Sequence, residues 1–225
     1  MSNIFSEHKG FWTRERKRSL YLGLLLVILS LFIQVNVGHY SSRRALSANP
    51  VGDLFLDNLP VINLDFIITQ GVLLVWAVSI FLLILKPRNL LLGIKAIALF
   101  IIFRAFFVSL THLGIYPRQI PVDAASIGSG LYNLATFQGN YFFSGHTGFP
   151  FLMALVFYDS KLLRRFFFAA TFVLGLSVLL AHVHYSIDVF AAPFITYGVF
   201  VIATKLFPRD YALIAPRKAG PEPVV

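Results

Sequence analysis

The chain has 225 residues, of which 57% are hydrophobic and 13% are charged, and its mean hydropathy is +0.76. Soluble domains carry about 25% charged residues, so this composition excludes a disordered chain and argues strongly against a soluble globular protein. The absence of cysteine excludes disulfide bonds and thiolate sites, and the net charge of +9 fits basic membrane loops better than binding of nucleic acid.

A bilayer-spanning helix needs about 20 apolar residues, and six segments of this chain reach or approach that length. These segments are residues 20–37, 66–85, 90–110, 143–158, 166–180 and 187–207. We therefore predict an all-α, polytopic membrane protein with six transmembrane helices. In this interpretation residues 1–19 form a basic N-terminal segment, residues 20–207 form the membrane domain, and residues 208–225 form a short solvated tail. The first apolar run is too long for a signal peptide, so we expect a retained span.

Lys and Arg residues are distributed unevenly among the segments that connect the spans. Fourteen of the 19 lie near the N-terminus, in the turns at 86–89 and 159–165, and near the C-terminus, whereas Arg43, Arg44 and Arg118 lie on the other side. Cytoplasmic loops are enriched in Lys and Arg, so we expect both termini in the cytoplasm. The two long connections, 38–65 and 112–142, then lie on the non-cytoplasmic side.

Several polar residues occur inside or at the ends of the predicted spans, where ionisable side chains are costly and mark functional sites. Arg104 lies in the third span, about 10 Å from its end at 1.5 Å per residue. The fourth span opens with Ser-Gly-His-Thr at 144–147, and the sixth opens with His-Tyr-Ser-Ile-Asp at 184–188. The predicted topology brings all three to the non-cytoplasmic side at one membrane depth.

His184 and Asp188 have the i, i+4 spacing that places two side chains on one face of a helix. A carboxylate that accepts a hydrogen bond from one ring nitrogen leaves the other nitrogen as a nucleophile or base. The alternative is a buried polar pair that only ties helices together. His182, two residues earlier, points elsewhere on a helix and is interpreted as packing at a helix end or against lipid headgroups.

The Ser-Gly-His-Thr segment begins a predicted helix, where free N–H groups and the helix dipole favour an anion. Gly145 allows the backbone to approach a ligand closely, and Ser144 and Thr147 join it as candidate phosphate-binding residues. His146 is a candidate proton donor to a leaving oxygen. The alternative is an ordinary helix cap made by Ser144 or Thr147.

Arg104 needs an anionic partner at its depth, and a phosphate matches the fork of donors on its guanidinium. The alternative partners are Asp188 and a backbone carbonyl. Lys95 lies nearer the cytoplasmic end of the same span, where its long side chain can reach the headgroup layer, and we expect no catalytic role for it.

Two histidines, an orienting carboxylate, a buried arginine and a helix N-terminus together favour phosphoryl transfer. The chain has no P-loop and no carboxylate cluster for magnesium, which argues against a nucleotide kinase. Zinc bound by His146, His184 and Asp188 is a less favoured alternative, because it leaves the anion-binding features unexplained. We therefore expect no cofactor and no metal.

At these residues the chain resembles the sphingomyelin synthase family, a branch of the type 2 phosphatidic acid phosphatase superfamily. Residues 143–147 read Phe-Ser-Gly-His-Thr, as in the family's first histidine motif, and residues 180–189 resemble its A-H-x-H-Y-[ST]-x-D-V motif. The segment that begins at Arg104 is similar to the family's arginine motif, and Pro-Val-Gly-Asp at 50–53 is similar to its P-L-P-D motif. The resemblance covers roughly residues 50–205.

The resemblance implies that His184 is the nucleophile, that Asp188 orients it and that His146 is the general acid. Two positions depart from the wider pattern. The superfamily's Ser-Arg pair is replaced by Ser177-Val178, which favours the synthase-like branch and increases the importance of Arg104. The family's acidic residue before the first histidine motif is replaced by Gly139-Asn140.

We therefore expect an integral plasma-membrane enzyme, in a bacterial inner membrane, whose site faces the periplasm or lumen. It would transfer the headgroup phosphate of a phospholipid donor to a lipid hydroxyl, a ceramide-type lipid by resemblance. The alternative acceptor is water, which would make the protein a lipid phosphate phosphatase. A transporter or scaffold is disfavoured, because the spans lack the broken, repeated helices common in transporters.

Overall fold

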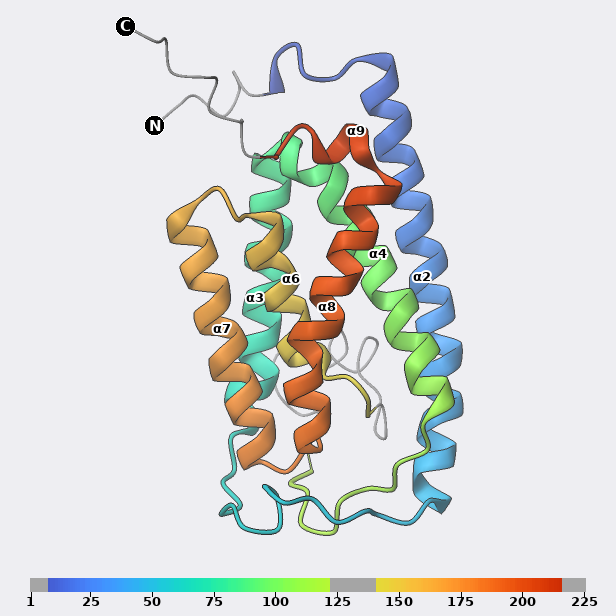
Figure 1. The fold of residues 1–225 in the computed structure, drawn as a ribbon, viewed down its shortest axis with the longest axis vertical. Helices are drawn as coiled ribbons and strands as arrows, with labels where there is room; N and C mark the ends of the chain where they lie inside the picture. Colours follow the sequence, from blue (N-terminus) through green and yellow to red (C-terminus); the bar gives the residue numbers. More distant parts are fainter. Residues whose placement is uncertain (1–7, 122–140, 216–225) are drawn as a thin grey trace, which may run out of the picture.

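The structure, a computed structural model, describes residues 8–121 and 141–215, and these residues form helices joined by loops (Figure 1). The helices are α2 (Arg14–Ser47), α3 (Asp65–Leu85), α4 (Pro87–Leu110), α6 (Gly145–Val156), α7 (Lys161–Leu180), α8 (Ser186–Leu206) and α9 (Pro208–Tyr211). The described residues contain no strand, which confirms the predicted all-α class for this part of the chain.

The long helices run side by side and alternate in direction (Figure 1). The segments 48–64 and 111–121 lie together at one end of the bundle, which we call the loop end. The start of α2, the turns that follow α3 and α6, and α9 lie at the opposite end, the α9 end. The basic segments therefore gather at one end, as the predicted topology requires, while the identity of the cytoplasmic end stays a prediction.

Among the described residues, five helices are long and apolar enough to cross a membrane, namely α2, α3, α4, α7 and α8. They correspond to five of the six predicted spans, although α2 begins at Arg14 and continues to Ser47, well beyond the predicted 20–37. The remaining span, predicted at 143–158, is the 12-residue helix α6. At 1.5 Å per residue α6 is about 18 Å long, shorter than a hydrocarbon core of about 30 Å.

Helix α6 is short because a serine caps its start and the backbone leaves the helical conformation after Val156. Ser144 caps its first turn, and the chain turns at Phe157 before Ser160 caps α7. Most of α6 is buried, and it packs mainly against α7 and α8. A Cβ atom on Gly148 would lie 2.8 Å from Phe100, so glycine is needed for the close approach of α4. The first histidine motif is thus held inside the bundle.

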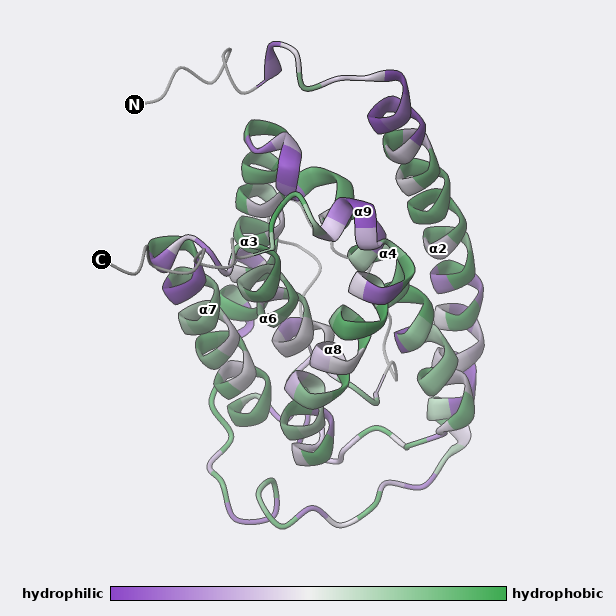
Figure 2. Ribbon diagram, turned by 45° about the horizontal axis from the view of Figure 1, so that its top comes forward, coloured by the Kyte–Doolittle hydropathy of each residue, from purple (hydrophilic) through white to green (hydrophobic). Residues whose placement is uncertain are grey.

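Large apolar side chains cover much of the outer surface of the long helices. Figure 2 shows hydrophobic colouring along most of their length, with hydrophilic segments concentrated towards the ends of α2, α7 and α9. Phe172 of α7 and Phe194 of α8 are 70% and 78% exposed. Soluble monomers rarely expose apolar patches of this extent, so the chain is an integral membrane protein whose outer face contacts lipid.

Lys95 departs from the sequence-based expectation at the α9 end. Its side chain is 2% exposed and forms an ion pair with Asp210 of α9, while also donating a hydrogen bond to Ser19. The prediction that Lys95 reaches the headgroup layer is therefore wrong, because a carboxylate inside the protein replaces water as its partner. Asp210 and Ile214 are also buried, so the expected solvated tail packs against the bundle at least as far as Ile214.

Candidate active site

His184 and Asp188 form a buried pair at the loop end of α8. His184 Nδ1 lies 3.3 Å from Asp188 Oδ2, and the two residues are 5% and 0% exposed. The predicted contact is present, but its geometry differs from the prediction, because His184 precedes the helix. Asp188 is the third residue of α8, and its Oδ2 also accepts a hydrogen bond from Tyr185 N at 3.1 Å. This capping interaction turns the chain so that His184 meets the carboxylate.

Asp188 also connects this pair to the segment that leads into α6. Its Oδ1 accepts a hydrogen bond from Phe142 N at 3.0 Å, and its backbone carbonyl accepts one from Ser144 N at 2.9 Å. Both carboxylate oxygens are therefore acceptors for backbone N–H groups. His184 Nε2 has no hydrogen bond with the described residues, so the contact with Asp188 engages Nδ1 and leaves Nε2 without a protein partner there.

His146, the second residue of α6, lies beside His184. The ring centroids are 5.8 Å apart with an interplanar angle of 66°, and His146 is 7% exposed. The two histidine motifs, 38 residues apart in the sequence, therefore supply two imidazoles to one buried site. One imidazole fixed by a carboxylate next to a second imidazole is the arrangement that nucleophilic catalysis with general acid–base assistance requires.

Arg104 of α4 reaches the same site from the side of α6. Its Nε donates a hydrogen bond to Phe143 O at 3.0 Å, so the carbonyl partner considered above is present. A Cβ atom on Gly145 would lie 3.4 Å from Nε and 3.7 Å from Cζ of Arg104. Gly145 therefore lets the guanidinium approach the first turn of α6. The charge of Arg104 is close enough to Asp188 and His146 to interact with both electrostatically.

The first turn of α6 combines a helix cap with one available donor. Ser144 Oγ accepts a hydrogen bond from Thr147 N at 3.4 Å, which is the ordinary cap considered above. The Gly145 N–H forms no hydrogen bond within the described residues and remains available to an anion. The buried Thr147 hydroxyl lies next to Gly175 of α7. Of these residues, Gly145 fits phosphate binding best, because its backbone N–H is available and Arg104 lies against it.

Two buried tyrosines complete the surroundings of His184, and the sequence analysis did not identify them. The ring of Tyr141 meets His184 edge-on at 6.2 Å and Tyr185 at 5.4 Å. Tyr141 donates a hydrogen bond to Gln119 Oε1 at 2.7 Å, and Tyr185 donates one to Gly114 O at 2.8 Å. Burial raises the pKa of both phenols, so both are neutral donors at physiological pH.

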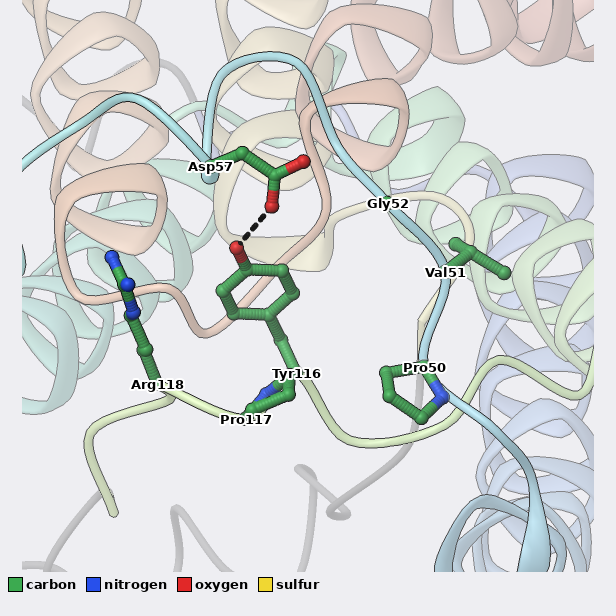
Figure 3. Close-up of a pocket in the computed structure, with 7 residues that line it drawn as sticks. All are labelled: Pro50, Val51, Gly52, Asp57, Tyr116, Pro117 and Arg118. Carbon is green, nitrogen blue, oxygen red and sulfur yellow. Dashed lines mark hydrogen bonds between the residues drawn. The ribbon is translucent and has the colours of Figure 1, made fainter.

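The loop end contains a cavity of about 430 Å³ (Figure 3). Its lining residues are Pro50, Val51, Gly52, Asp57, Tyr116, Pro117 and Arg118. Tyr116 donates a hydrogen bond to Asp57 Oδ1 at 2.6 Å, drawn as a dashed line in Figure 3, and its ring packs edge-on against Tyr185 at 5.9 Å. The loops therefore contact the residue that follows His184.

His182 lies apart from the histidine pair, as its position suggested, but it is not on a helix. It lies in the turn between α7 and α8, with a φ of 55° and complete burial, and its ring packs against Tyr116 at 5.3 Å. The described residues contain no group of three or more His, Cys, Asp or Glu side chains arranged to hold a metal ion. Gly139-Asn140, noted above as a departure, lies outside the described residues.

Comparisons with known proteins identify the family that this chain resembles. The family model described as PAP2 superfamily C-terminal matches residues 139–205, which include both histidine motifs. Sphingomyelin synthase-related protein 1 of Mus musculus is 32% identical over 179 residues, covering 68% of this chain and 37% of the relative. The Homo sapiens protein of the same name is 31% identical over 179 residues, covering 68% and 43%. The chain thus spans about two fifths of the length of these relatives.

Proposed function

We propose that this chain transfers a phospholipid headgroup phosphate to a lipid hydroxyl through a phosphohistidine. The chain belongs to the sphingomyelin synthase-like branch of the PAP2 superfamily, a family of lipid phosphatases and phosphotransferases. The observation that carries the proposal is the pairing of His184 with Asp188, with the His146 ring 5.8 Å away. That geometry supports one imidazole as nucleophile and the other as acid and base.

In the first step, Asp188 accepts a hydrogen bond from the N–H at His184 Nδ1, which keeps the lone pair on Nε2. Nε2 attacks the phosphorus of the donor phosphodiester, so that a nitrogen–phosphorus bond forms and the bond to the diacylglycerol oxygen breaks. Protonated His146 donates its proton to the departing oxygen. Diacylglycerol leaves, and the headgroup phosphate remains on His184.

During this step negative charge develops on the phosphoryl oxygens. Arg104 and the Gly145 N–H are the groups that would stabilise it, because both lie at the first turn of α6. A guanidinium and a helix N-terminus are two of the most effective phosphate-binding groups in proteins. Because they are held by helices α4 and α6, they need little reorganisation when charge develops.

In the second step, neutral His146 removes the proton from the acceptor hydroxyl, whose oxygen attacks phosphorus. The nitrogen–phosphorus bond breaks and neutral His184 returns. One phosphodiester replaces another, so the scheme requires no ATP. A ceramide-type acceptor follows from the family resemblance, and we place the reaction on the non-cytoplasmic side of the plasma membrane. Water in the acceptor position would make the product a free phosphate ester.

The test uses purified protein reconstituted with phosphatidylcholine or phosphatidylethanolamine labelled in the headgroup, with and without ceramide, and separates the lipids by thin-layer chromatography. We expect a new labelled phospholipid and an equal amount of diacylglycerol. Release of inorganic phosphate from phosphatidate, without a new phospholipid, would identify a phosphatase. His184→Ala should abolish either reaction, whereas His112→Ala, which removes an exposed histidine at the same end of the bundle, should not.

The covalent step has its own readout. Brief incubation with labelled donor and no acceptor should leave label on the wild-type protein, and this label should be lost in acid and retained in alkali, as for phosphohistidine. Full transfer by His184→Ala would overturn the covalent route, while label on a residue other than His184 would assign the nucleophile elsewhere.

A further inference from the structure

The loop at 48–64 contacts the chain between His184 and Asp188. Asp53 Oδ2 accepts a hydrogen bond from Ser186 N at 2.7 Å, across 133 positions of sequence. Two residues earlier, Val51 N donates a hydrogen bond to the Tyr185 hydroxyl at 3.3 Å. Both contacts involve the two residues that immediately follow His184, so this loop is bonded to the backbone that carries the proposed nucleophile.

Both oxygens of the Asp53 carboxylate accept hydrogen bonds from backbone N–H groups. Its Oδ1 accepts hydrogen bonds from Phe55 N at 3.0 Å and Leu56 N at 3.1 Å, while Oδ2 accepts the one from Ser186 N. The residue is 7% exposed. Burial alone would raise the pKa of Asp53, but the hydrogen bonds from Ser186, Leu56 and Phe55 outweigh it and hold the pKa below the ordinary value. Only an ionised carboxylate accepts on both oxygens in this way.

The second loop at the same end holds Asp53 in position. Asp57 Oδ2 accepts a hydrogen bond from Asp53 N at 3.1 Å, and Asp57 Oδ1 accepts one from the Tyr116 hydroxyl at 2.6 Å. Figure 3 shows this second bond joining the loop at 48–64 to the segment that carries Tyr116 and Arg118. Gly114 N also donates to Asn49 O at 3.3 Å. The two loops therefore form one hydrogen-bonded layer over the start of α8.

The start of α8 determines where both members of the catalytic pair lie. Ser186 is the first residue of the helix, His184 precedes it by two positions and Asp188 follows it by two. A shift of the Ser186 backbone therefore moves the imidazole and the carboxylate together. A carboxylate at a helix N-terminus also interacts favourably with the helix dipole, which strengthens the contact of Asp53 with Ser186.

We infer that Asp53 is a positioning residue for the transfer reaction, acting through the Ser186 backbone N–H to hold His184 and Asp188 at the angle and depth that attack on phosphorus requires. The inference rests on the proposed function of His184. It assigns a physical role to the Pro-Val-Gly-Asp segment at 50–53, and it connects the outer loops to a site formed by α4, α6 and α8.

The test removes the same hydrogen bond from each side. Asp53→Asn keeps the size of the side chain but must turn its NH₂ group towards a backbone N–H group, so it cannot accept all three bonds. Ser186→Pro removes the donor, and the site tolerates proline because the first residue of a helix has no intrahelical N–H bond. Tyr185, with φ −64° and ψ 153°, already has the conformation required before proline. Ser186→Ala keeps the N–H and removes only the Ser186 hydroxyl, which also hydrogen-bonds Asp53, so it is the control for loss of the side chain without loss of the backbone donor.

We expect Asp53→Asn and Ser186→Pro each to lower kcat by about tenfold to a hundredfold, as small misplacements of reacting groups do, with KM close to wild type and only a small decrease in melting temperature. Because both remove one interaction, the double variant should lose no more than the worse single variant. Ser186→Ala should retain most activity. Adding Asp53→Asn to His184→Ala should lower activity no further.

Wild-type kcat in Asp53→Asn, or losses that multiply in the double variant, would overturn the inference. Unfolding of both single variants would also overturn it, because it would assign Asp53 a purely structural role. His184→Ala in the same assay separates this outcome from failure of the proposed function. If His184→Ala is inactive and Asp53→Asn is fully active, the result supports the proposed reaction and contradicts the role of Asp53. Full activity of His184→Ala would instead contradict the assignment of His184 as the nucleophile.

Discussion

The two ends of α8 each adjoin a buried carboxylate paired with a basic side chain. At the loop end Asp188 accepts from His184 and from two backbone N–H groups, and at the other end Asp210 pairs with Lys95 and accepts from Ser19. The first pair leaves a ring nitrogen available beside a second histidine. The second pair encloses its ammonium between Ser19, Asp210 and the ring of Phe207.

We interpret this difference as the one between the proposed reactive site and a structural ion pair. Burial and charge are common to both pairs, and each pair includes one residue of a candidate span, Asp188 or Lys95, where ionisable side chains are costly. What distinguishes the loop end is an available nitrogen on the base, together with an arginine and a helix N-terminus. The Lys95 ammonium donates to a carboxylate and a hydroxyl in a closed site, so it has no comparable access to a substrate. The comparison therefore makes opposite predictions for substitutions at the two carboxylates.

The largest effect is expected for Asp188→Asn. An asparagine cannot accept on both of its terminal atoms, so it disfavours the tautomer of His184 that keeps the lone pair on Nε2. In a catalytic triad the equivalent change lowers turnover by about four orders of magnitude, and we expect a loss of at least about a hundredfold here. The measurement is labelled-lipid transfer per mole of folded protein, with folded protein counted by size-exclusion chromatography in detergent.

Asp210→Asn is the matched control for that substitution at the other end of α8. It should lower the yield and melting temperature of the protein while leaving turnover per folded molecule close to wild type. Equal losses of turnover in Asp188→Asn and Asp210→Asn would remove the distinction between the two pairs.

The second prediction concerns the stability of the Lys95 site. Lys95→Met leaves Asp210 buried without its cation, and removing one partner of a buried ion pair typically costs about 3–5 kcal/mol. Adding Asp210→Asn removes the unpaired charge, so the double variant should regain part of that loss. Thermal or denaturant unfolding in micelles measures both effects. A double variant less stable than Lys95→Met would contradict this account of the pair.

Much of the candidate site could be predicted from the sequence because its residues are out of place in lipid. Arg104, His146, His184 and Asp188 are ionisable groups near the ends of apolar spans, and the order of the spans brings those ends together. The contact of His184 with Asp188 was predicted by helical spacing. The structure forms it through a helix cap instead, because a carboxylate three residues into a helix bonds back to the backbone that precedes it.

The features that the sequence did not reveal depend on contacts between distant segments. Lys95 and Asp210 are 115 positions apart, and nothing local to either residue indicates the other. Tyr141 and Tyr185 are two of nine tyrosines in a chain with 24 phenylalanines, so their residue type alone did not mark them as neighbours of the site. The length of α6 was overestimated because apolar composition continues past Val156, where the backbone turns into α7. Asp53 matched a motif, but its partner, Ser186 N, is a backbone group.

The smallest effect is expected for the pH dependence that Asp53 gives to stability. Its pKa in the folded protein lies below the ordinary value of 3.8, so the unfolded chain binds a proton first as the pH falls. The carboxylate therefore stabilises the fold fully above the unfolded pKa, and this contribution disappears as the pH falls through the lower folded value. Asp53→Asn lacks the titrating group. The melting temperatures of wild type and Asp53→Asn should differ by a constant amount from neutral pH to about pH 5 and converge below 3.8. A difference that widens in acid would mean that Asp53 is not held as an ionised acceptor at Ser186, and would remove the electrostatic basis of its contact with α8.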